Sequence, residues 1–179
     1  MNSKKISLFK DKPDYIKVIT DDKIYNITGL KKSGKTPYTR NKSKDNLVIH
    51  LKSVFNKNSN RKNTPSKKIQ EYILFKYGNN LNPKDYFEAR YYDTIIEYVN
   101  NQDKPSYIEG DYIYNIINLS KLKGTIIIKR TSIVACLKRI IKIENLTNLI
   151  YIIKELFNLI KESKKINIFI SNLEEYDVR

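Results

Sequence analysis

Apolar positions near the N-terminus of the chain occur in short runs that are typical of β-strands. Two such runs, 15–20 and 23–28, flank the polar pair Asp21-Asp22. Because β-branched runs on either side of a polar turn are typical of a β-hairpin, we predict an antiparallel hairpin over these residues. A third strand is predicted over 47–51, and a closing strand over 166–170.

Further along the chain, apolar residues recur at the three- and four-residue spacing of helices. The first helix is predicted to begin at Thr64-Pro65, where a capping residue precedes a proline suited to the first helical position, and to end at Gly78-Asn79. A second helix is predicted from Asn82-Pro83 to about residue 100. We expect the two to form a helical hairpin.

The last third of the chain contains signals for two more helices. One is predicted from Thr131 or Ser132 to about residue 142, and a strongly apolar one from Asn145 or Thr147 to about residue 162. The run 107–120 is left unassigned between helix and strand. Residues of the first of these helices that we expect to face inward are Ile133, Val134, Leu137, Ile140 and Ile141.

These elements together predict an α+β fold. A small antiparallel β region with a long basic loop at the N-terminus is expected to pack with a part of four to five helices and a closing strand. We divide the chain into a basic β and loop region, 1–63, and a helical region with the closing strand, 64–179. The length of 179 residues suits one domain, so we expect both regions to form one compact unit.

Charge is strongly positive and is separated along the chain. The 34 Lys and Arg residues exceed the 19 Asp and Glu residues by 15. Residues 1–68 hold 18 basic and 5 acidic residues, 120–165 hold 11 and 3, and 69–119 hold 4 and 8. The AT-rich codons of Lys, Asn, Ile and Tyr explain part of the lysine excess but not this separation. Blocks of one sign create a field that attracts polyanions.

Nucleic acid is therefore the expected partner, with DNA favoured over RNA, and the expected role is non-catalytic binding to phosphates. Most of the contacts are expected from the basic loop 29–44, where an interleaved tyrosine can stack on a base. The predicted nucleic-acid-binding residues are Lys31, Lys32, Lys35, Tyr38, Arg40, Lys42, Lys44, Arg61, Lys62, Lys129, Arg130, Lys138, Arg139 and Lys142.

Residues 29–36, Gly-Leu-Lys-Lys-Ser-Gly-Lys-Thr, match the phosphate-binding pattern GxxxxGK[ST]. Phosphate binding by this loop requires a buried parallel strand before it and a helix that starts at its lysine. The preceding run is predicted as a hairpin strand, 37–46 has no apolar helical face, and we find no later apolar run that ends in Asp. We therefore interpret the match as a chance feature of a basic loop, and we predict no cofactor.

A helix-turn-helix is a second candidate element. Its first helix would be 113–122, its turn residue Gly124 and its recognition helix 131–142, with Lys129 and Arg130 near base edges. The apolar run 125–129 makes the turn too long for the standard motif. The alternative is that this run is a buried strand on which the next helix packs.

Candidates for catalysis are few, and we predict neither a catalytic nor a metal-binding residue. His50 lies in an apolar strand, and Cys136 is expected to be buried and inert. One cysteine and one histidine cannot form a disulfide or a Cys/His zinc site. Glu109 and Asp111, followed by Lys129-Arg130, leave a metal-dependent nuclease as an alternative function.

A protein-interaction module is the third functional class that we consider. The predicted helical hairpin 64–100 carries the acidic block and would serve a protein partner or self-association. Lysines interrupt every apolar run well before the length of a membrane span, and no signal peptide is recognised at the N-terminus. We therefore expect a soluble, intracellular protein without a membrane partner.

Overall fold

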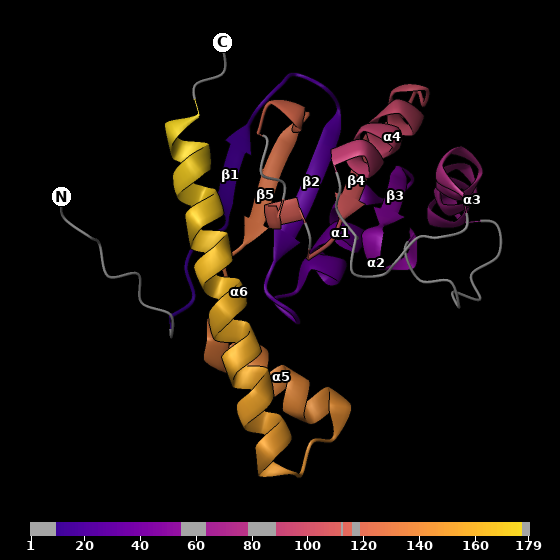
Figure 1. The fold of residues 1–179 in the computed structure, drawn as a ribbon. Coiled ribbons are helices and arrows are strands. Elements are labelled where there is room, and N and C mark those ends of the chain that lie inside the picture. Colours follow the sequence, from indigo (N-terminus) through magenta and orange to yellow (C-terminus); the bar gives the residue numbers. More distant parts are fainter. Residues whose placement is uncertain (1–9, 55–63, 79–88, 112, 116–118, 177–179) are drawn as a thin grey trace.

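The computed structural model describes residues 10–54, 64–78, 89–111, 113–115 and 119–176. A five-stranded sheet is combined with helices, which confirms the predicted α+β fold class (Figure 1). The strands are β1 Tyr15–Val18, β2 Ile24–Gly29, β3 Leu47–His50, β4 Ser106–Glu109 and β5 Thr125–Lys129. The helices are α1 Lys35–Ser43, α2 Leu51–Val54, α3 Pro65–Tyr77, α4 Ala89–Asn100, α5 Ile133–Glu144 and α6 Leu149–Glu175, with 3-10 turns at Ile113–Asn115 and Leu119–Lys121.

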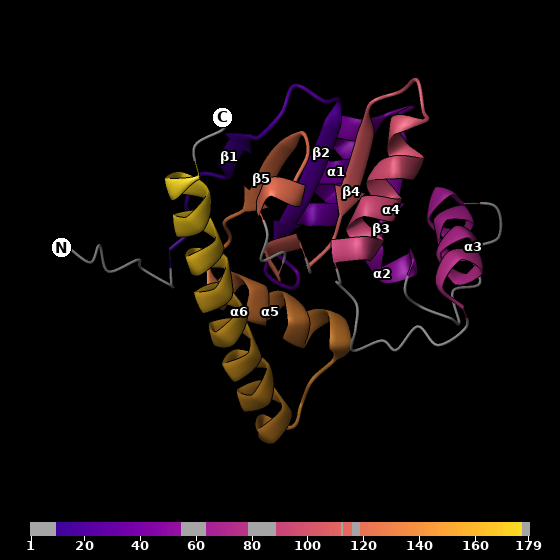
Figure 2. The same ribbon diagram turned by 45° about the horizontal axis from the view of Figure 1, so that its top comes forward.

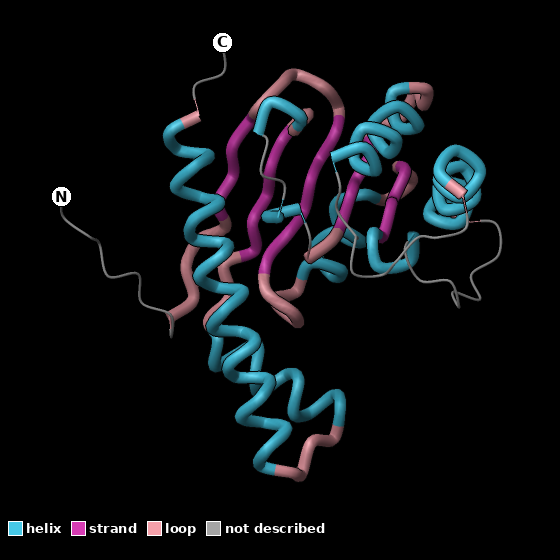
Figure 3. Tube along the Cα trace, viewed as in Figure 1, coloured by secondary structure: helices cyan, strands magenta, loops and turns pink. Residues whose placement is uncertain are grey.

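The sheet is mostly parallel, with the strand order β1-β5-β2-β4-β3. β2 lies in the centre and is parallel to both β4 and β5, β3 is parallel to β4, and only β1 runs antiparallel, to β5. Figure 3 shows the five strands side by side. The carboxyl ends of β2, β3, β4 and β5 therefore meet at one edge of the sheet. Ligands of such sheets bind at this edge, beside the strand where the order of connections reverses.

The predicted hairpin over 15–28 is wrong, because β5 lies between β1 and β2. After β1, the backbone N–H groups of Ile19 and Thr20 both donate to the carbonyl of Gly124, directly before β5, at 2.9 and 3.3 Å. The inserted strand contains three consecutive buried isoleucines, 126–128. A strand that comes a hundred residues later in the chain therefore replaces the local pairing partner that we predicted.

Helices cover both faces of the sheet: in Figures 1 and 2, α1 lies behind it and α6 in front. The predicted closing strand over 166–170 is wrong, because these residues continue α6 to Glu175. Ile166, Phe169, Ile170 and Leu173 are buried at helical spacing, whereas the side chain of Ile168 is 62% exposed. Residues 166–170 are therefore helical because this part of helix α6 buries one of its faces, and this burial outweighs the strand-like pattern of the short apolar run.

The predicted helix starts at the caps of α3 and α5 are confirmed. The Thr64 side chain accepts a hydrogen bond from the backbone N–H of Lys67 at 3.3 Å, and Ser132 accepts one from Ala135 at 3.3 Å. Asn148, not 145 or 147, caps α6. On α5, Val134 is exposed, contrary to the prediction that it faces inward.

Helices α3 and α4 pack together, as expected for the acidic hairpin. The Tyr77 hydroxyl lies 3.1 Å from the Thr94 hydroxyl, and the rings of Tyr77 and Tyr91 meet edge to face with centroids 5.4 Å apart. Gly78 follows the last residue of α3 as predicted. The predicted start of the second helix at 82–83 lies outside the described residues.

The helix-turn-helix prediction is wrong. Residues 113–115 and 119–121 form short 3-10 turns, and 125–129 form the buried strand β5, so no helix of the described chain precedes α5 at the required position. The alternative, that α5 follows a buried strand, is confirmed. Cys136 on α5 is fully buried, and burial raises the pKa of its thiol to about 11. None of the helices described is both long enough and apolar enough to cross a membrane.

Candidate phosphate-binding site

The loop 29–36 lies between the central strand β2 and the helix α1. Both structural reasons for treating its GxxxxGK[ST] pattern as a chance match are wrong. β2 is a buried strand with a parallel neighbour on each side, and a helix begins at Lys35, within the stretch that we predicted to be a loop. The pattern therefore stands in the structural context that phosphate binding by this loop requires.

The glycines of the pattern are required by the path of the loop. Gly29 has a φ of 145°, and a Cβ at this position would lie 2.7 Å from the carbonyl oxygen of Lys129. Gly34 has a φ of 96°, and Lys32 also has a positive φ, 61°. The loop closes on itself through a hydrogen bond of 3.0 Å from the N–H of Ser33 to the carbonyl of Leu30. Loops with such alternating backbone conformations form concave sites lined by N–H groups, which bind anions.

Helix α1 was not predicted because it has no apolar face. Its buried residues are Lys35, Thr39 and Ser43, and the Thr39 hydroxyl donates to the carbonyl of Lys35 at 3.0 Å. An apolar face is the usual sequence signal of a buried helix, and here polar side chains take its place. At the start of α1, Lys35 and Thr36 have N–H groups without a carbonyl partner within the helix, since Pro37 has no N–H and Tyr38 donates to the carbonyl of Gly34 at 3.1 Å. These two N–H groups are donors for an anion.

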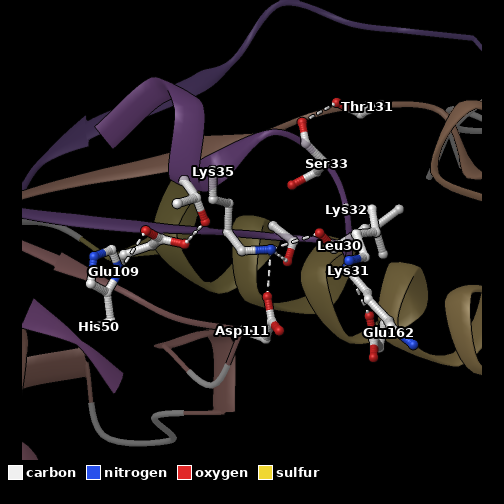
Figure 4. Close-up of polar contacts among 12 residues, drawn as sticks. Leu30, Lys31, Lys32, Ser33, Lys35, His50, Glu109, Asp111, Thr131 and Glu162 are labelled. Atoms are coloured by element: carbon white, nitrogen blue, oxygen red, sulfur yellow. Dashed lines mark hydrogen bonds and ion pairs between the residues drawn. The ribbon is translucent and has the colours of Figure 1, made fainter. Parts of the chain in front are cut away.

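Lys35 is buried at the centre of the site (Figure 4). Its Nζ donates to the carbonyls of Gly29 and Leu30 at 3.1 and 2.7 Å and forms an ion pair with Asp111. These acceptors hold the ammonium group directly below the loop. In a phosphate-bound state, phosphate oxygens would take the place of some of these acceptors.

Glu109 ends β4 beside the loop, paired in register with Ile27 of β2 and with His50 of β3. The Thr36 hydroxyl donates to Glu109 Oε1 at 2.7 Å. His50 Nδ1 lies 3.0 Å from Glu109 Oε2 (Figure 4). Burial alone would raise the pKa of Glu109, but the hydrogen bonds from His50 and Thr36 and the charge of Lys35 lower it. The carboxylate is therefore ionised at neutral pH.

From the sequence we named Glu109 as a candidate acid but did not connect it with the loop 29–36, because we expected a strand that ends in Asp, and β4 ends in Glu. Its alternative grouping of Glu109 and Asp111 with Lys129-Arg130 is not the one found. Asp111 pairs with Lys35, whereas Lys129 pairs with Asp14. Parallel strand order, which local patterns do not encode, brings these groups to one edge.

The donor set at Thr36 and Glu109 suits Mg²⁺. A hydroxyl and a carboxylate, already in contact, are hard oxygen ligands of the kind that this ion prefers. The part of the chain that the structure describes contains no group of three or more His, Cys, Asp or Glu residues able to hold a metal. A magnesium ion would therefore need further oxygens from phosphate and water, which is its usual coordination in nucleotide sites.

A cavity of about 720 Å³ extends from the loop along α1 to the end of β3. This volume is within the range of pockets that hold whole small molecules. At the end near β3, Thr36, Arg40 and Ser43 share one face of α1 and line the cavity opposite His50 and Lys52. At the other end, the cavity reaches Lys31, Lys32 and the last turn of α5.

Near α5 and α6, the loop is held by a set of carboxylates. Lys31 Nζ lies 3.2 Å from both Glu144 and Glu155, and its backbone N–H donates to Glu162 at 3.4 Å. Arg139 donates to the carbonyl of Lys32 at 2.9 Å. Burial opposes charge on Lys31, but hydrogen bonds to Glu155 and Glu144 raise its pKa. The helices α5 and α6 thus bind the rim of the loop directly.

The structure separates the residues that we predicted to bind nucleic acid. Lys31, Lys32, Lys35 and Arg40 line one cavity. Tyr38 stacks under the Lys129 ammonium, which lies 4.4 Å from its ring centroid. The remaining described members, at or near the surface outside that cavity, are Lys42, Lys44, Arg130, Lys138, Arg139 and Lys142. Arg61 and Lys62 lie outside the described residues.

Comparison with protein families and curated proteins does not indicate a function for this site. A scan against protein-family models found no match to the chain, and a search of curated proteins also found none.

Proposed function

We propose that the protein binds a nucleoside triphosphate with Mg²⁺ through the loop 29–36 and transfers its terminal phosphoryl group. The single observation that carries the proposal is the position of the GxxxxGK[ST] pattern. It connects a central parallel strand to the N-terminus of a helix, with an acid from the adjacent strand in contact with its threonine. In such an arrangement the N–H groups of the loop and of the helix start cradle phosphates, and the lysine and threonine reach the phosphates and their Mg²⁺.

Each residue has a role in this proposal. The N–H groups of the loop other than those of Lys31 and Ser33, which already donate to Glu162 and Leu30, would hold the phosphates together with the first N–H groups of α1. The Lys35 ammonium would bind the terminal oxygens of the phosphates. Thr36 and Glu109 would hold Mg²⁺, which when bound offsets the charge of the phosphates. Ser33 Oγ supports the proposal because it is buried within the loop and has no hydrogen-bond partner among the described residues, so it is free to donate to a phosphate.

The end of the cavity near β3 has basic side chains that suit a second substrate. Arg40 and Lys52 face this end, and no carboxylate of the described residues forms an ion pair with either. Free cations there favour an anionic acceptor, and we propose a phosphate monoester such as a nucleoside monophosphate. One of its phosphate oxygens would attack the γ-phosphorus, and the bond from that phosphorus to the β,γ-bridging oxygen would break. The products are a nucleoside diphosphate and the phosphorylated acceptor.

Nucleic-acid binding remains a second proposal. The net charge of +15 and the exposed Lys42, Lys44, Lys138 and Lys142 support it. Several of the other predicted contacts are already engaged within the protein, as Lys31 and Lys129 are in ion pairs. The observations on the loop favour the nucleotide as the principal ligand.

A titration with a fluorescent ATP analogue tests the first proposal and compares it with the second. In near-physiological salt with Mg²⁺, we expect saturable binding that unlabelled nucleoside triphosphates displace and that EDTA or Glu109→Gln weakens. Duplex DNA should displace the analogue poorly. If no nucleoside triphosphate binds, while DNA binds with an affinity that falls steeply with salt, the nucleotide proposal is wrong and the nucleic-acid proposal is correct.

The acceptor site is tested by the double variant Arg40→Ala/Lys52→Ala. We expect it to raise the KM for nucleoside monophosphates by about 10-fold or more, because two charge-assisted contacts are lost, while ATP affinity changes little. The control is Lys42→Ala/Lys44→Ala. It also removes two positive charges, one from α1 and one from the residue that follows α1, and neither residue lines the cavity. Equal effects of both double variants, or faster transfer to nucleosides and sugar phosphates than to nucleoside monophosphates, would contradict this acceptor.

A further inference from the structure

The end of the helical pair α5 and α6 exposes a cluster of large apolar side chains. Ile150 is 74% exposed and Leu149 is 68% exposed, values that are unusual for side chains of this size near one another. We call this cluster the apolar tip. Its members are Leu149, Ile150, Tyr151, Ile153 and Phe157.

The apolar tip is a continuous surface and not a set of scattered residues. On α6, Ile150, Ile153 and Phe157 follow one another at three- and four-residue spacing and therefore share one face. Ile143, in the last turn of α5, is also exposed, but it lines the cavity at the phosphate-binding loop and is not part of the tip. Figures 1 and 2 show this end of the helical pair extending away from the sheet, so a flat surface could reach it.

Positive charge surrounds the apolar tip. Lys154 and Lys161 each follow one turn after an apolar member of the α6 face, and Lys142 precedes Ile143; all three lysines are exposed. The carboxylates of this region, Glu144 and Glu155, are both paired with Lys31 of the phosphate-binding loop. The outward surface is therefore apolar with a basic border.

We propose that the apolar tip binds the surface of an anionic lipid bilayer. A helix face with apolar side chains and flanking lysines can enter the headgroup region, where the lysines meet the negative lipids and their stems extend along the apolar surface. Charge complementarity favours this partner over a second copy of the chain, because two apposed tips would bring their lysine borders together. No described helix spans a membrane, so the contact is peripheral.

Vesicle flotation with the full chain tests the proposal. We expect the protein to float with vesicles of phosphatidylcholine and phosphatidylserine, and to bind vesicles of phosphatidylcholine alone at least about 10-fold more weakly. Lys142→Glu/Lys154→Glu should weaken the binding to anionic vesicles by about 25-fold or more, since each lysine near the surface contributes a factor of about five. Lys23→Glu/Lys104→Glu is the control, because these exposed lysines lie outside the helical pair.

The apolar part is tested separately by Ile150→Ser/Phe157→Ser, which should reduce vesicle binding even at low salt. The control is Ile16→Ser/Val18→Ser, which removes apolar side chains of β1 that are 59% and 55% exposed. Equal binding to both kinds of vesicle, or a concentration-dependent dimer that Ile150→Ser/Phe157→Ser dissociates, would overturn the proposal. Nucleotide affinity, measured on the same variants, should be unchanged, so this result is independent of the proposed function.

Discussion

Lys35→Ala is expected to lower the affinity for a nucleoside triphosphate by about 10- to 100-fold. A hydrogen bond to a charged group contributes about 1.5 to 3 kcal/mol, and the buried ammonium would make such bonds to the phosphates. Lys35 is the only charged residue of α1 that is buried, and it lies directly below the loop. The measurement is the fluorescent ATP titration, compared with Lys42→Ala, which removes an exposed lysine from the same helix.

Loss of Lys35 also removes contacts within the protein, so the variant needs a stability control. Its Nζ binds the carbonyls of Gly29 and Leu30 and pairs with Asp111, which would be left without its partner. The double variant Lys35→Ala/Asp111→Asn removes this unpaired charge and should recover stability but not nucleotide affinity. Wild-type affinity in Lys35→Ala, at undiminished stability, would contradict the proposed role of the lysine. Recovery of affinity in the double variant would show that its effect was only on folding.

Gly124→Ala is expected to destabilise the fold by about 3 to 5 kcal/mol, through a strained backbone and a steric clash. Gly124 has a φ of 73°, and a Cβ would lie 2.1 Å from the carbonyl oxygen of Ile24. The same residue holds the end of β1, since its carbonyl accepts from Ile19 and Thr20 and its N–H donates to the Thr20 hydroxyl at 2.6 Å. It thus joins β1, β2 and β5 at one point.

Urea denaturation followed by circular dichroism measures this effect, since the chain has no Trp to serve as a fluorescent probe. Gly78→Ala is the matched control. Gly78 also has a positive φ, 81°, but an added Cβ would meet nothing within 4 Å. We therefore expect it to cost only the backbone strain, about 1 to 2 kcal/mol. Equal losses in the two variants would show that the close approach of Gly124 to Ile24 does not limit stability.

Local sequence signals located several elements correctly. Thr64 with Pro65 and Ser132 mark the starts of α3 and α5, because a cap depends on a hydroxyl and the next few N–H groups. The run 47–51 includes β3, and the buried position of Cys136 follows from its place on α5. The α+β class follows from these local elements. The pattern at 29–36 was also visible in the sequence, since it depends only on residue identity and spacing.

The pairing of the strands was decided by the tertiary structure. β2 is a central parallel strand because β5 pairs with it on one side and β4 on the other. Together with the helix that begins at Lys35, this places the pattern at 29–36 in the context that phosphate binding requires. Glu109, His50 and Thr36 come from three separate elements and meet only because the carboxyl ends of parallel strands share one edge. A local sequence pattern cannot predict that these three side chains lie in contact.

The sequence by itself determined where the chain can start a helix, which segments have enough apolar residues for a core, and that a phosphate-binding pattern is present. Only the tertiary structure decided that α1 is helical despite its polar faces, that 166–170 extend α6, and that an acid lies against Thr36. Caps and apolar runs act over a few residues, within reach of local sequence. Strand order and burial depend on contacts between residues that are far apart in the chain. The free energy of these contacts cannot be inferred from a short segment of sequence.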